Sequence, residues 1–454
     1  MRQINLRHGL AMLLATACIT AAQAQDVWTV DRCMQYAVSH NHAVRQSELE
    51  LKNNSLDRLK AFGSFLPRVQ GAISAQYNFG RSIDPETNTY NDVTTFNNYY
   101  DLAASIPLFS GGSIVNEVRR SRAAVLMGKA ALQEQKDNTA FETFQAYIQA
   151  LYCRGTVRMA RQKLAESDST LYKTRIQEEV GLKGEADVAQ MAAQQATDAY
   201  NLTKQENLYA TAMLELKQKM NYPADEPLQL DTTLLDSRVI DGADLEHISA
   251  DDVWQVAEQN NPTLQKSGYN ARALKMELHK AWASVMPSIS ASAGYYTSYY
   301  KQLHKQYSSF GDQFKNNHGS YFSFSLSIPI FSRLDAITGI RKARNNYRIA
   351  LEQLDEQRAE LHKLVQQAVQ DRDGYLKESI QMEKKEESDA LAYRVTRRKY
   401  EEGLMTSLDV QTSSATWLDS QASLLQSKLT YFMKCRLVDY YRGGAIIDSN
   451  NIDK

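Results

Sequence analysis

The chain has 454 residues and an almost balanced charge, with 52 basic and 53 acidic side chains. This balance argues against a nucleic-acid-binding protein, which would normally carry a basic excess. The hydrophobic content of 43% is ordinary, so a chain of this length can bury a real core, either in two or three domains or in one large repeated unit.

The first 24 residues have the features of a secretory signal peptide. Two arginines precede an apolar run over 9–20, and Ala22-Gln23-Ala24 fits a small-residue cleavage site. We therefore expect residues 1–24 to be removed on export. The alternative is a lipid attached to Cys18, although Ala15 stands where such sites usually have Leu, three residues before the cysteine.

The exported chain would keep three cysteines, at 33, 153 and 435. Export implies an oxidising compartment, but an odd number of widely spaced cysteines predicts no disulfide framework. Three small buried or neutral residues are the simpler interpretation. No later segment has 18 consecutive apolar residues, so the sequence predicts no transmembrane helix. A chain that nevertheless spans a membrane must do so as a closed barrel.

The sequence contains the same unit twice. Ile106-Pro107-Leu108-Phe109-Ser110 recurs as Ile328-Pro329-Ile330-Phe331-Ser332, and Glu179-Val180-Gly181-Leu182 recurs as Glu401-Glu402-Gly403-Leu404, both after 222 positions. Several collinear matches at one offset indicate a duplication. The predicted organisation is a first structural repeat at 25–222, an inter-repeat linker at 223–250, a second repeat at 251–442 and a C-terminal tail at 443–454.

Each repeat is predicted to begin with a helix, about 30–61 and 251–284, that stops before a proline. Apolar and polar residues then alternate with a period of two, which predicts strands. The four predicted strands are about 69–80, 98–109, 288–300 and 320–331. The polar, Asn-rich stretches 82–98 and 301–320 are predicted to be exposed loops.

Long helices are predicted after each strand pair, because no proline falls in 108–222 or 330–454. Residues spaced by seven in the second repeat indicate helices packed along their length. They are Ile340, Tyr347, Leu354, Leu361, Ala368 and Tyr375, with Ala343, Ala350 and Leu364 in a companion seam. The long helices, about 113–180 and 334–402, would each measure roughly 100 Å. Shorter returning helices are predicted at about 185–220 and 407–441.

The strands match the length of tilted membrane-spanning strands. Their polar or small positions are Ser74, Gln76, Asn78, Ser105, Ser290, Ser292, Ser323, Ser325 and Ser327. Aromatic residues crowd the loop-proximal ends, as in an interfacial girdle, at Tyr77, Phe79, Tyr99, Tyr100, Tyr295, Tyr299, Tyr321 and Phe322. A soluble sandwich with one wet face is the alternative. Four strands cannot close a barrel, whereas twelve strands from three protomers leave room for a lumen.

The signal peptide, the duplicated strand pairs and the long helices together resemble the TolC-like outer membrane efflux protein family, over nearly the whole exported chain. The resemblance implies a mixed α and β membrane protein, a homotrimer whose shared 12-stranded outer-membrane β-barrel continues as a long periplasmic α-helical barrel. It also implies a passive exit duct of a tripartite efflux or type I secretion system. The partners would be outer-membrane lipid, a periplasmic adaptor protein and an energised inner-membrane pump of the RND or ABC type.

The turns between long and short helices, 180–188 and 400–410, resemble the periplasmic tips of that family, which meet the adaptor. The resemblance implies adaptor-contacting residues at Gly181, Leu182, Gly403 and Leu404. It implies a pore constriction or gate at Asp409, Asp187 and Tyr400. Met405 stands where some members carry a basic residue, so a salt-bridged lock of that type is not expected.

The two aspartates have a second interpretation as helix caps. Thr406 can cap the helix that starts at Ser407, with Asp409 completing a capping box, and Asp187 follows Gly184 in a similar way. A carboxylate in the first turn of a helix is also favoured by the helix dipole. Both interpretations stay open for each aspartate.

No motif predicts catalysis or a cofactor. His40 and His42 lack a companion His or Cys cluster, so a polar helix end is more plausible than a metal site. Gly111-Gly112 is not followed by the Lys-Ser/Thr of a phosphate loop, and no nucleophile elbow or HExxH motif occurs. We expect a channel rather than an enzyme, with no cofactor and no metal. The rival class is an exported coiled-coil spacer, and the sequence does not indicate the cargo.

Overall fold

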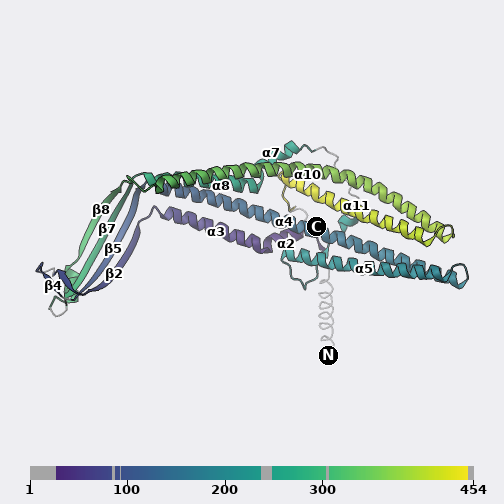
Figure 1. Ribbon diagram of the computed structural model, residues 1–454, viewed down its shortest axis with the longest axis horizontal. Helices are drawn as coiled ribbons and strands as arrows, with labels where there is room; N and C mark the ends of the chain where they lie inside the picture. The colour runs from purple at the N-terminus through teal and green to yellow at the C-terminus, as the bar shows by residue number, and fades with distance from the viewer. Residues whose placement is uncertain (1–26, 84–86, 93, 237–247, 303–305, 448–454) are drawn as a thin grey trace, which may run out of the picture. The chain divides into compact units, whose positions relative to one another are not determined.

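The computed structural model describes residues 27–83, 87–92, 94–236, 248–302 and 306–447 (Figure 1). The expected signal peptide, its cleavage site and Cys18 lie outside these residues. The chain divides into two compact units. The helical unit comprises Met1–Ser47, Leu132–Asn261 and Ala359–Lys454, and the sheet unit comprises Glu48–Ala131 and Pro262–Arg358.

The sheet unit contains a four-stranded antiparallel sheet in the order β2-β5-β7-β8. The strands are β2 (Arg68–Asn78), β5 (Thr95–Ser110), β7 (Ser288–Gln302) and β8 (Gly319–Ser327). The central pair, β5 and β7, joins the two halves of the chain, and β2 and β8 are the edges (Figure 1).

The register gives the sheet one polar and one apolar face, because successive side chains of a strand point to opposite faces. Ser74 pairs with Tyr99, and Tyr99 with Ser298, on the polar face. Ile73 pairs with Tyr100, and Tyr100 with Thr297, on the apolar face. The polar face also carries Gln70, Gln76, Asn97, Ser105, Ser290, Ser292, Ser323 and Ser325. The apolar face also carries Val69, Tyr77, Leu102, Phe322, Phe324 and Leu326.

The strand ends differ from the prediction at β8 and β5. The strand expected over 320–331 ends at Ser327, and Ile330 and Phe331 are largely exposed. Pro329 explains the early end, since proline cannot donate to a strand ladder. In β5 the equivalent Pro107 is accommodated by a register shift between Pro107 and Phe109. The strand expected from 98 begins at Thr95.

The two predicted loops contain regular structure. The first, 82–98, contributes to the hairpin of β3 (Arg81–Ile83) and β4 (Tyr90–Asp92). The second, 301–320, contains α9 (Phe310–Asn316), whose first turn is capped by the Ser309 hydroxyl, which accepts from the Asp312 amide. The polar composition that suggested a loop therefore included a helix-capping signal.

Helix α9 covers the part of β7 that extends beyond the end of β8. The Gln313 side-chain amide donates to the carbonyl of Tyr300 and accepts from its N–H, both at 3.0 Å. The Asn317 amide donates to the carbonyl of Ser298 at 3.0 Å. Side chains thus supply the hydrogen bonds that a neighbouring strand would otherwise make.

The helices around the sheet are α3 (His42–Gly63), α8 (Pro262–Ala281), η2 (Trp282–Val285) and the first parts of α4 (Ser113–Glu179) and α10 (Asp335–Glu401). Between α4 and α8, the Glu117 carboxylate contacts Arg120 and lies 2.9 Å from the Lys280 ammonium, while Arg120 lies 3.4 Å from Glu277. The hydrogen bond from Arg120 and the contact with Lys280 lower the pKa of Glu117 to about 2.

The low pKa of Glu117 predicts an acid-sensitive contribution to stability. A carboxylate with a lowered pKa stabilises the fold above its ordinary value of 4.5, and this contribution is lost as pH falls towards about 2. We expect Glu117→Gln to lower the melting temperature by about 2–4 °C near pH 7, with the difference from wild type vanishing near pH 2. Thermal unfolding followed by circular dichroism measures this. Glu360→Gln, in the exposed pair with Lys363, is the matched control and should show no difference at either pH.

The helical unit contains α2 (Val30–His40), α5 (Glu185–Met220), α7 (Ala250–Asn260), α11 (Ser407–Tyr441) and the distal parts of α4 and α10. Its core includes the buried side chains of Cys33, Met34, Phe144, Tyr147, Leu151, Leu216 and Met220. The Tyr147 hydroxyl donates to the carbonyls of Trp28 and Asp231. Burial raises the pKa of the Cys33 and Cys153 thiols, so both behave as small apolar residues.

Two sequence expectations need correction here. The helices expected over 30–61 and 251–284 are each interrupted, at Asn41 and Asn261, where the backbone is extended. The Asn41 side chain accepts from the Ala43 amide, and Pro262 disfavours helix at Asn261. The linker expected over 223–250 contains α6 (Thr233–Asp236) and β6 (Gln229–Leu230), which pairs in parallel with β1 (Val27–Trp28).

Among the described residues, no helix combines the length and the apolar character needed to cross a membrane.

His40 stacks on the Tyr36 ring with centroids 3.9 Å apart, and its Nδ1 lies 2.8 Å from the Ser39 hydroxyl. The described residues contain no group of three or more His, Cys, Asp or Glu side chains arranged to hold a metal ion.

Candidate functional site: the helical tips and an interhairpin cluster

Two helical hairpins in the helical unit end in matching turns, which we call the tips. In the first tip, between α4 and α5, Gly181 has φ +74°, and the Leu182 amide donates to the Gln177 carbonyl at 2.7 Å. In the second, between α10 and α11, Gly403 has φ +78°, and the Leu404 amide donates to the Lys399 carbonyl at 2.8 Å. Both are Schellman closures, in which the left-handed position favours glycine.

Each turn leaves one leucine in solvent. The exposed fractions are 74% for Leu182 and 72% for Leu404. Their backbone amides are used to close the preceding helix, so the side chains project from the turn instead of returning to a core. An apolar side chain held outward at each tip suits a contact with another protein.

Asp409 completes a capping box at the start of α11. Its carboxylate accepts from the Thr406 amide at 2.9 Å and from the Thr406 hydroxyl at 2.7 Å, and its own amide donates to that hydroxyl. The hydrogen bonds from Thr406 lower the pKa of Asp409, so the exposed carboxylate is charged at neutral pH. The cap does not exclude a second role, because the charge remains exposed.

Asp187 makes the simpler cap. Its carboxylate accepts from the Gly184 amide at 3.2 Å, and glycine has no side chain that could bond to the helix in return.

Tyr400 is buried, with an exposed fraction of 6%, and its hydroxyl has no hydrogen-bond partner in the described chain. The structure therefore does not join Asp187 to Tyr400. Instead, the Lys183 ammonium of the first tip lies 4.6 Å from the centre of the Tyr400 ring, a cation–π contact between the two hairpins.

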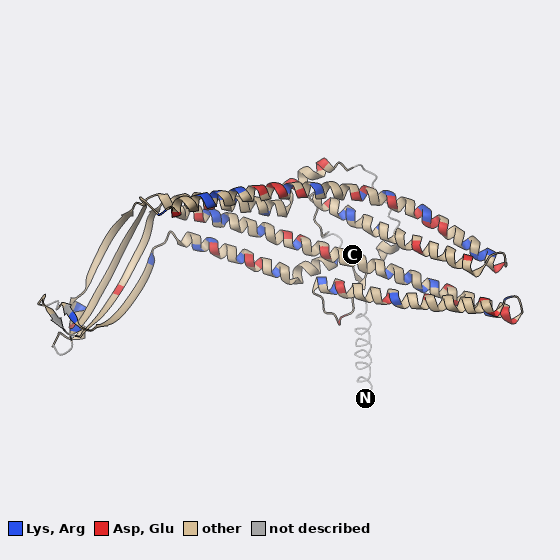
Figure 2. Ribbon diagram, viewed as in Figure 1, with Lys and Arg blue, Asp and Glu red and all other residues tan. Residues whose placement is uncertain are grey.

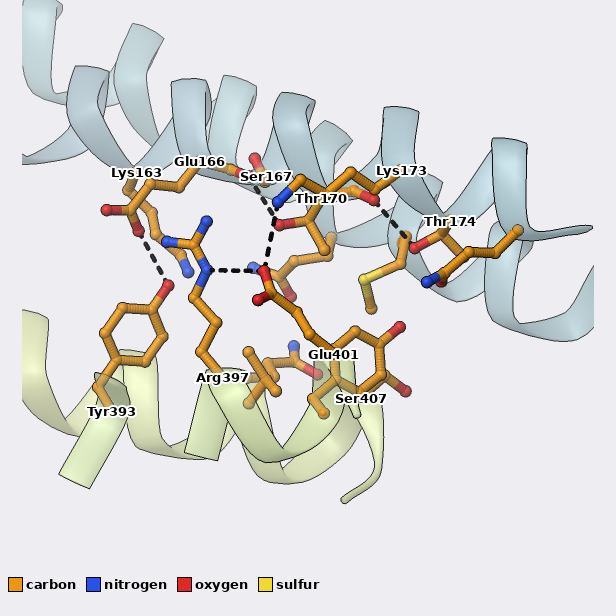
Figure 3. A pocket seen from close by; sticks show the side chains of 16 residues that line it. Lys163, Glu166, Ser167, Thr170, Lys173, Thr174, Tyr393, Arg397, Glu401 and Ser407 are labelled. Atoms are coloured by element: carbon orange, nitrogen blue, oxygen red, sulfur yellow. Dashed lines mark hydrogen bonds and ion pairs between the residues drawn. The ribbon is translucent and has the colours of Figure 1, made fainter. Parts of the chain in front are cut away.

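Next to the tips, polar side chains connect the hairpins α4–α5 and α10–α11 (Figure 3). We call this group the interhairpin cluster: Lys163, Glu166, Lys173, Asp198, Tyr393, Arg397, Glu401 and Ser414. The Tyr393 hydroxyl donates to Glu166 at 3.0 Å, and the Lys163 ammonium donates to the Ser414 hydroxyl. Glu401 lies 3.3 Å from Lys173 and 3.8 Å from Arg397 (Figure 3).

The centre of the cluster is poorly solvated. Burial lowers the pKa of Lys163 and raises the pKa of Asp198, which has an exposed fraction of 5%. The attraction between these two charges opposes both shifts. Burial and the neighbouring Glu166 raise the pKa of Tyr393 to about 12, so its hydroxyl remains a donor at neutral pH.

A cavity of about 60 Å³ lies beside the cluster and is lined from α4, α5, α10 and α11 (Figure 3). This volume can hold a few water molecules. Its walls include Thr170, Thr174, Met191 and Tyr400. A small cavity between helices means that the packing near the tips is looser than in the apolar core.

The tips are predictable from the sequence, whereas the interhairpin cluster was not expected. A signal was present: Lys163, Ser167, Thr170, Thr174 and Gln177 follow the spacing of a helical seam, where apolar residues are usual. Polar residues in such a seam fix pairing at a cost in stability. The partners of this seam lie more than 200 positions away, as with Lys163 and Ser414, and so could not be matched from the sequence.

These features define a class of protein: TolC-like outer-membrane channels, with two long-helix hairpins closed by glycine turns and a sheet with one polar and one apolar face. The outer membrane efflux protein family model matches residues 33–221 and 253–431. The chain belongs to this family of outer-membrane efflux channels, and it is located in the outer membrane. The family consists of transporters and not of enzymes.

Solved structures give the same fold at low sequence identity. CusC, described in connection with transmembrane channel formation, has a TM-score of 0.78 and 16% identity, with 92% of each chain covered. VceC from Vibrio cholerae has a TM-score of 0.76 and 14% identity, covering 92% of this chain and 96% of that one. The CmeC channel of Campylobacter jejuni has a TM-score of 0.75 and 15% identity, covering 91% and 85%. None of the curated protein sequences matches the chain.

Proposed function

We propose that three copies of this chain form a passive exit duct through the outer membrane, which opens when an adaptor binds the helical tips. The observation that carries the proposal is the four-stranded sheet, with its apolar face, its polar face and two edge strands. Energy would come from an inner-membrane pump of the RND or ABC type, as the family resemblance implies.

The apolar face suits contact with lipid. Ile73, Phe322 and Phe324 have exposed fractions of 75%, 68% and 66%. Side chains of this kind would be costly in water over a whole sheet face, but they are favourable against hydrocarbon. The opposite face, with its serines and amides, would then line an aqueous lumen.

The edge strands support assembly into a trimer. Unpaired edges at β2 and β8 cannot be satisfied by lipid, so each must pair with another chain. Three four-stranded sheets give twelve strands, enough to leave a lumen. In the sheet unit the exposed apolar residues of α3, namely Leu49, Leu56, Leu59 and Phe62, offer a second contact surface. The helices of three protomers would continue the duct as a periplasmic helical barrel.

The tips and the interhairpin cluster support a gate. Contacts across the two hairpins, from Lys183 to Tyr400 and from Glu166 to Tyr393, favour a closed arrangement. An adaptor that binds Leu182 and Leu404 only when the hairpins separate would shift the population towards the open state. Three Asp409 carboxylates would form a negative ring inside the mouth, which favours cations.

The proposal is tested with purified protein in planar lipid bilayers. Wild type should give discrete single-channel currents, and light scattering in detergent should show a trimer. Asp409→Asn should reduce cation selectivity and blocking by multivalent cations while the trimer persists. A folded monomer without conductance supports the coiled-coil spacer and overturns the channel. A loss of stability in Asp409→Asn with unchanged selectivity would mean that Asp409 acts only as a cap.

A further inference from the structure

A hollow of about 600 Å³ lies on the sheet unit where β5 and β7 approach α9. Its lining includes Asn97, Tyr99, Tyr300, Tyr307, Gln313 and Asn317. Asn97 pairs with Tyr300 and Tyr99 with Ser298 on the polar face, while Asn98 and Tyr299 line the hollow from the other face. The described residues that line the hollow include no charged side chain.

The walls of the hollow are held in place. Gln313 is fixed to the backbone of Tyr300 by the two hydrogen bonds described above, and Asn317 to that of Ser298. The Tyr307 hydroxyl donates to the Gln302 side chain at 2.8 Å, and its ring meets the Tyr300 ring edge-on at 5.5 Å. A site with fixed walls loses little conformational entropy when it binds a ligand.

An aromatic surface continues from the hollow along the polar face. Tyr99 stacks on Tyr296 with centroids 5.8 Å apart. A Cβ atom at Gly319 would lie 2.6 Å from the Tyr296 ring, and one at Gly294 would lie 2.5 Å from the Tyr321 ring. The two glycines therefore allow these rings to lie flat on the sheet.

We propose that the hollow and these tyrosines form a binding site for neutral saccharide chains that pass through the duct. The proposal rests on the proposed function, because the polar face lines a lumen only in the assembled channel. Sugar rings have C–H faces that pack on aromatic rings and hydroxyl groups that both donate and accept hydrogen bonds. The phenols, amides and serine hydroxyls of the site supply both kinds of partner.

The charges on the polar face favour a neutral ligand. Asp101, opposite Tyr296, is outside the lining of the hollow, and Arg68 lies at the other end of β2. Figure 2 shows the strands mostly in tan, with few charged positions along them. A charged ligand in the hollow would lose hydration without an ion-pair partner, whereas a neutral polyhydroxylated ligand exchanges its water for amides and phenols.

The test uses single channels of the full-length trimer, with maltohexaose added on the side of the strand loops. Wild type should show brief, reversible current interruptions, and Tyr99→Ala and Tyr300→Ala should each weaken saccharide binding about tenfold, as for loss of one aromatic anchor. Tyr99→Phe, which keeps the ring, should retain most of the affinity. Tyr77→Ala removes an exposed tyrosine from the apolar face and should leave the interruptions unchanged.

The control is a polyethylene glycol of the same size as maltohexaose. If it interrupts the current as often and for as long as the saccharide does, and the tyrosine variants do not change these interruptions, the inference is overturned. Calorimetric titration of maltohexaose into the protein in an amine-oxide detergent gives a second readout. Absence of conductance counts against the proposed duct, whereas absence of saccharide binding by calorimetry counts against the site alone.

Discussion

Leu404→Asp abolishes adaptor-dependent export while the bilayer conductance of the purified channel remains: this is the expected result for a docking residue at the second tip. Leu404 is 72% exposed, and full burial of such a side chain contributes about 1.5–3 kcal/mol. An aspartate there would have to lose its hydration against an apolar partner surface. In the proposed trimer, three copies of each tip would amplify the loss, because docking would be multivalent.

The measurement is cargo export from cells that carry the variant, together with co-purification of the adaptor. Leu404→Met keeps the size and apolar character and should export normally. The Schellman hydrogen bond of residue 404 uses its backbone amide, so neither variant should disturb the turn. Normal export by Leu404→Asp would place the docking surface elsewhere.

Lys163→Met should give the second large effect, an increase of at least about tenfold in the open fraction of the channel without adaptor. The substitution removes the link from α4 to Ser414 of α11 and leaves the buried Asp198 without its nearby positive charge. A hydrogen bond from a charged donor contributes about 1.5–3 kcal/mol, so loss of the Ser414 link, which joins the hairpins only when they are closed, is enough for a tenfold shift.

The control is a double-mutant cycle. Lys163→Met with Asp198→Asn removes both charges and should restore the part of the closure that the uncompensated Asp198 charge costs, but not the link to Ser414. If the single and double variants leak equally, the whole effect comes from the lost link to Ser414. Single-channel recordings at fixed voltage measure the open fraction in each case.

The same pair gives a pH dependence with a defined sign. Burial raises the pKa of Asp198, so this carboxylate is neutralised at a higher pH than an exposed aspartate as the solution is acidified. Because burial in the closed arrangement raises this pKa, the closed state binds the proton more tightly than an open state in which the carboxylate is solvated, so acid favours closure. Wild type should therefore leak less as pH falls, and the double variant should lack this component.

The long helices were predictable from the sequence because their signal is periodic and local. Seven-residue spacing and the absence of proline predicted the helix that the structure shows at Asp335–Glu401. The seam was less accurate. Leu364 was expected in the buried seam, but its side chain is 40% exposed. The next residue, Val365, is fully buried instead. A straight helix of 3.6 residues per turn drifts from a seven-residue repeat by about 20° per heptad, which moves the buried position by one residue.

Boundaries that depend on tertiary pairing were not predictable. The same Ile-Pro dipeptide lies inside β5 at Pro107 and beyond the end of β8 at Pro329. The first is a central strand that continues past the proline through an irregular register with β7, whereas the second is an edge. The caps of Asp409 and Asp187 were predictable, since a capping box is a four-residue pattern. The contacts of Lys183 and Lys163 were not, because they join separate hairpins.

The side chain of Gln313 has a consequence for how copies of the chain can join. By occupying both hydrogen-bonding groups of Tyr300, it leaves that stretch of β7 nothing to offer an incoming strand. In the proposed trimer, strands of a neighbouring protomer would then meet an edge only along β8, from Gly319 onwards. One glutamine would thus protect the uncovered end of β7 from recruiting a strand out of register before assembly is complete.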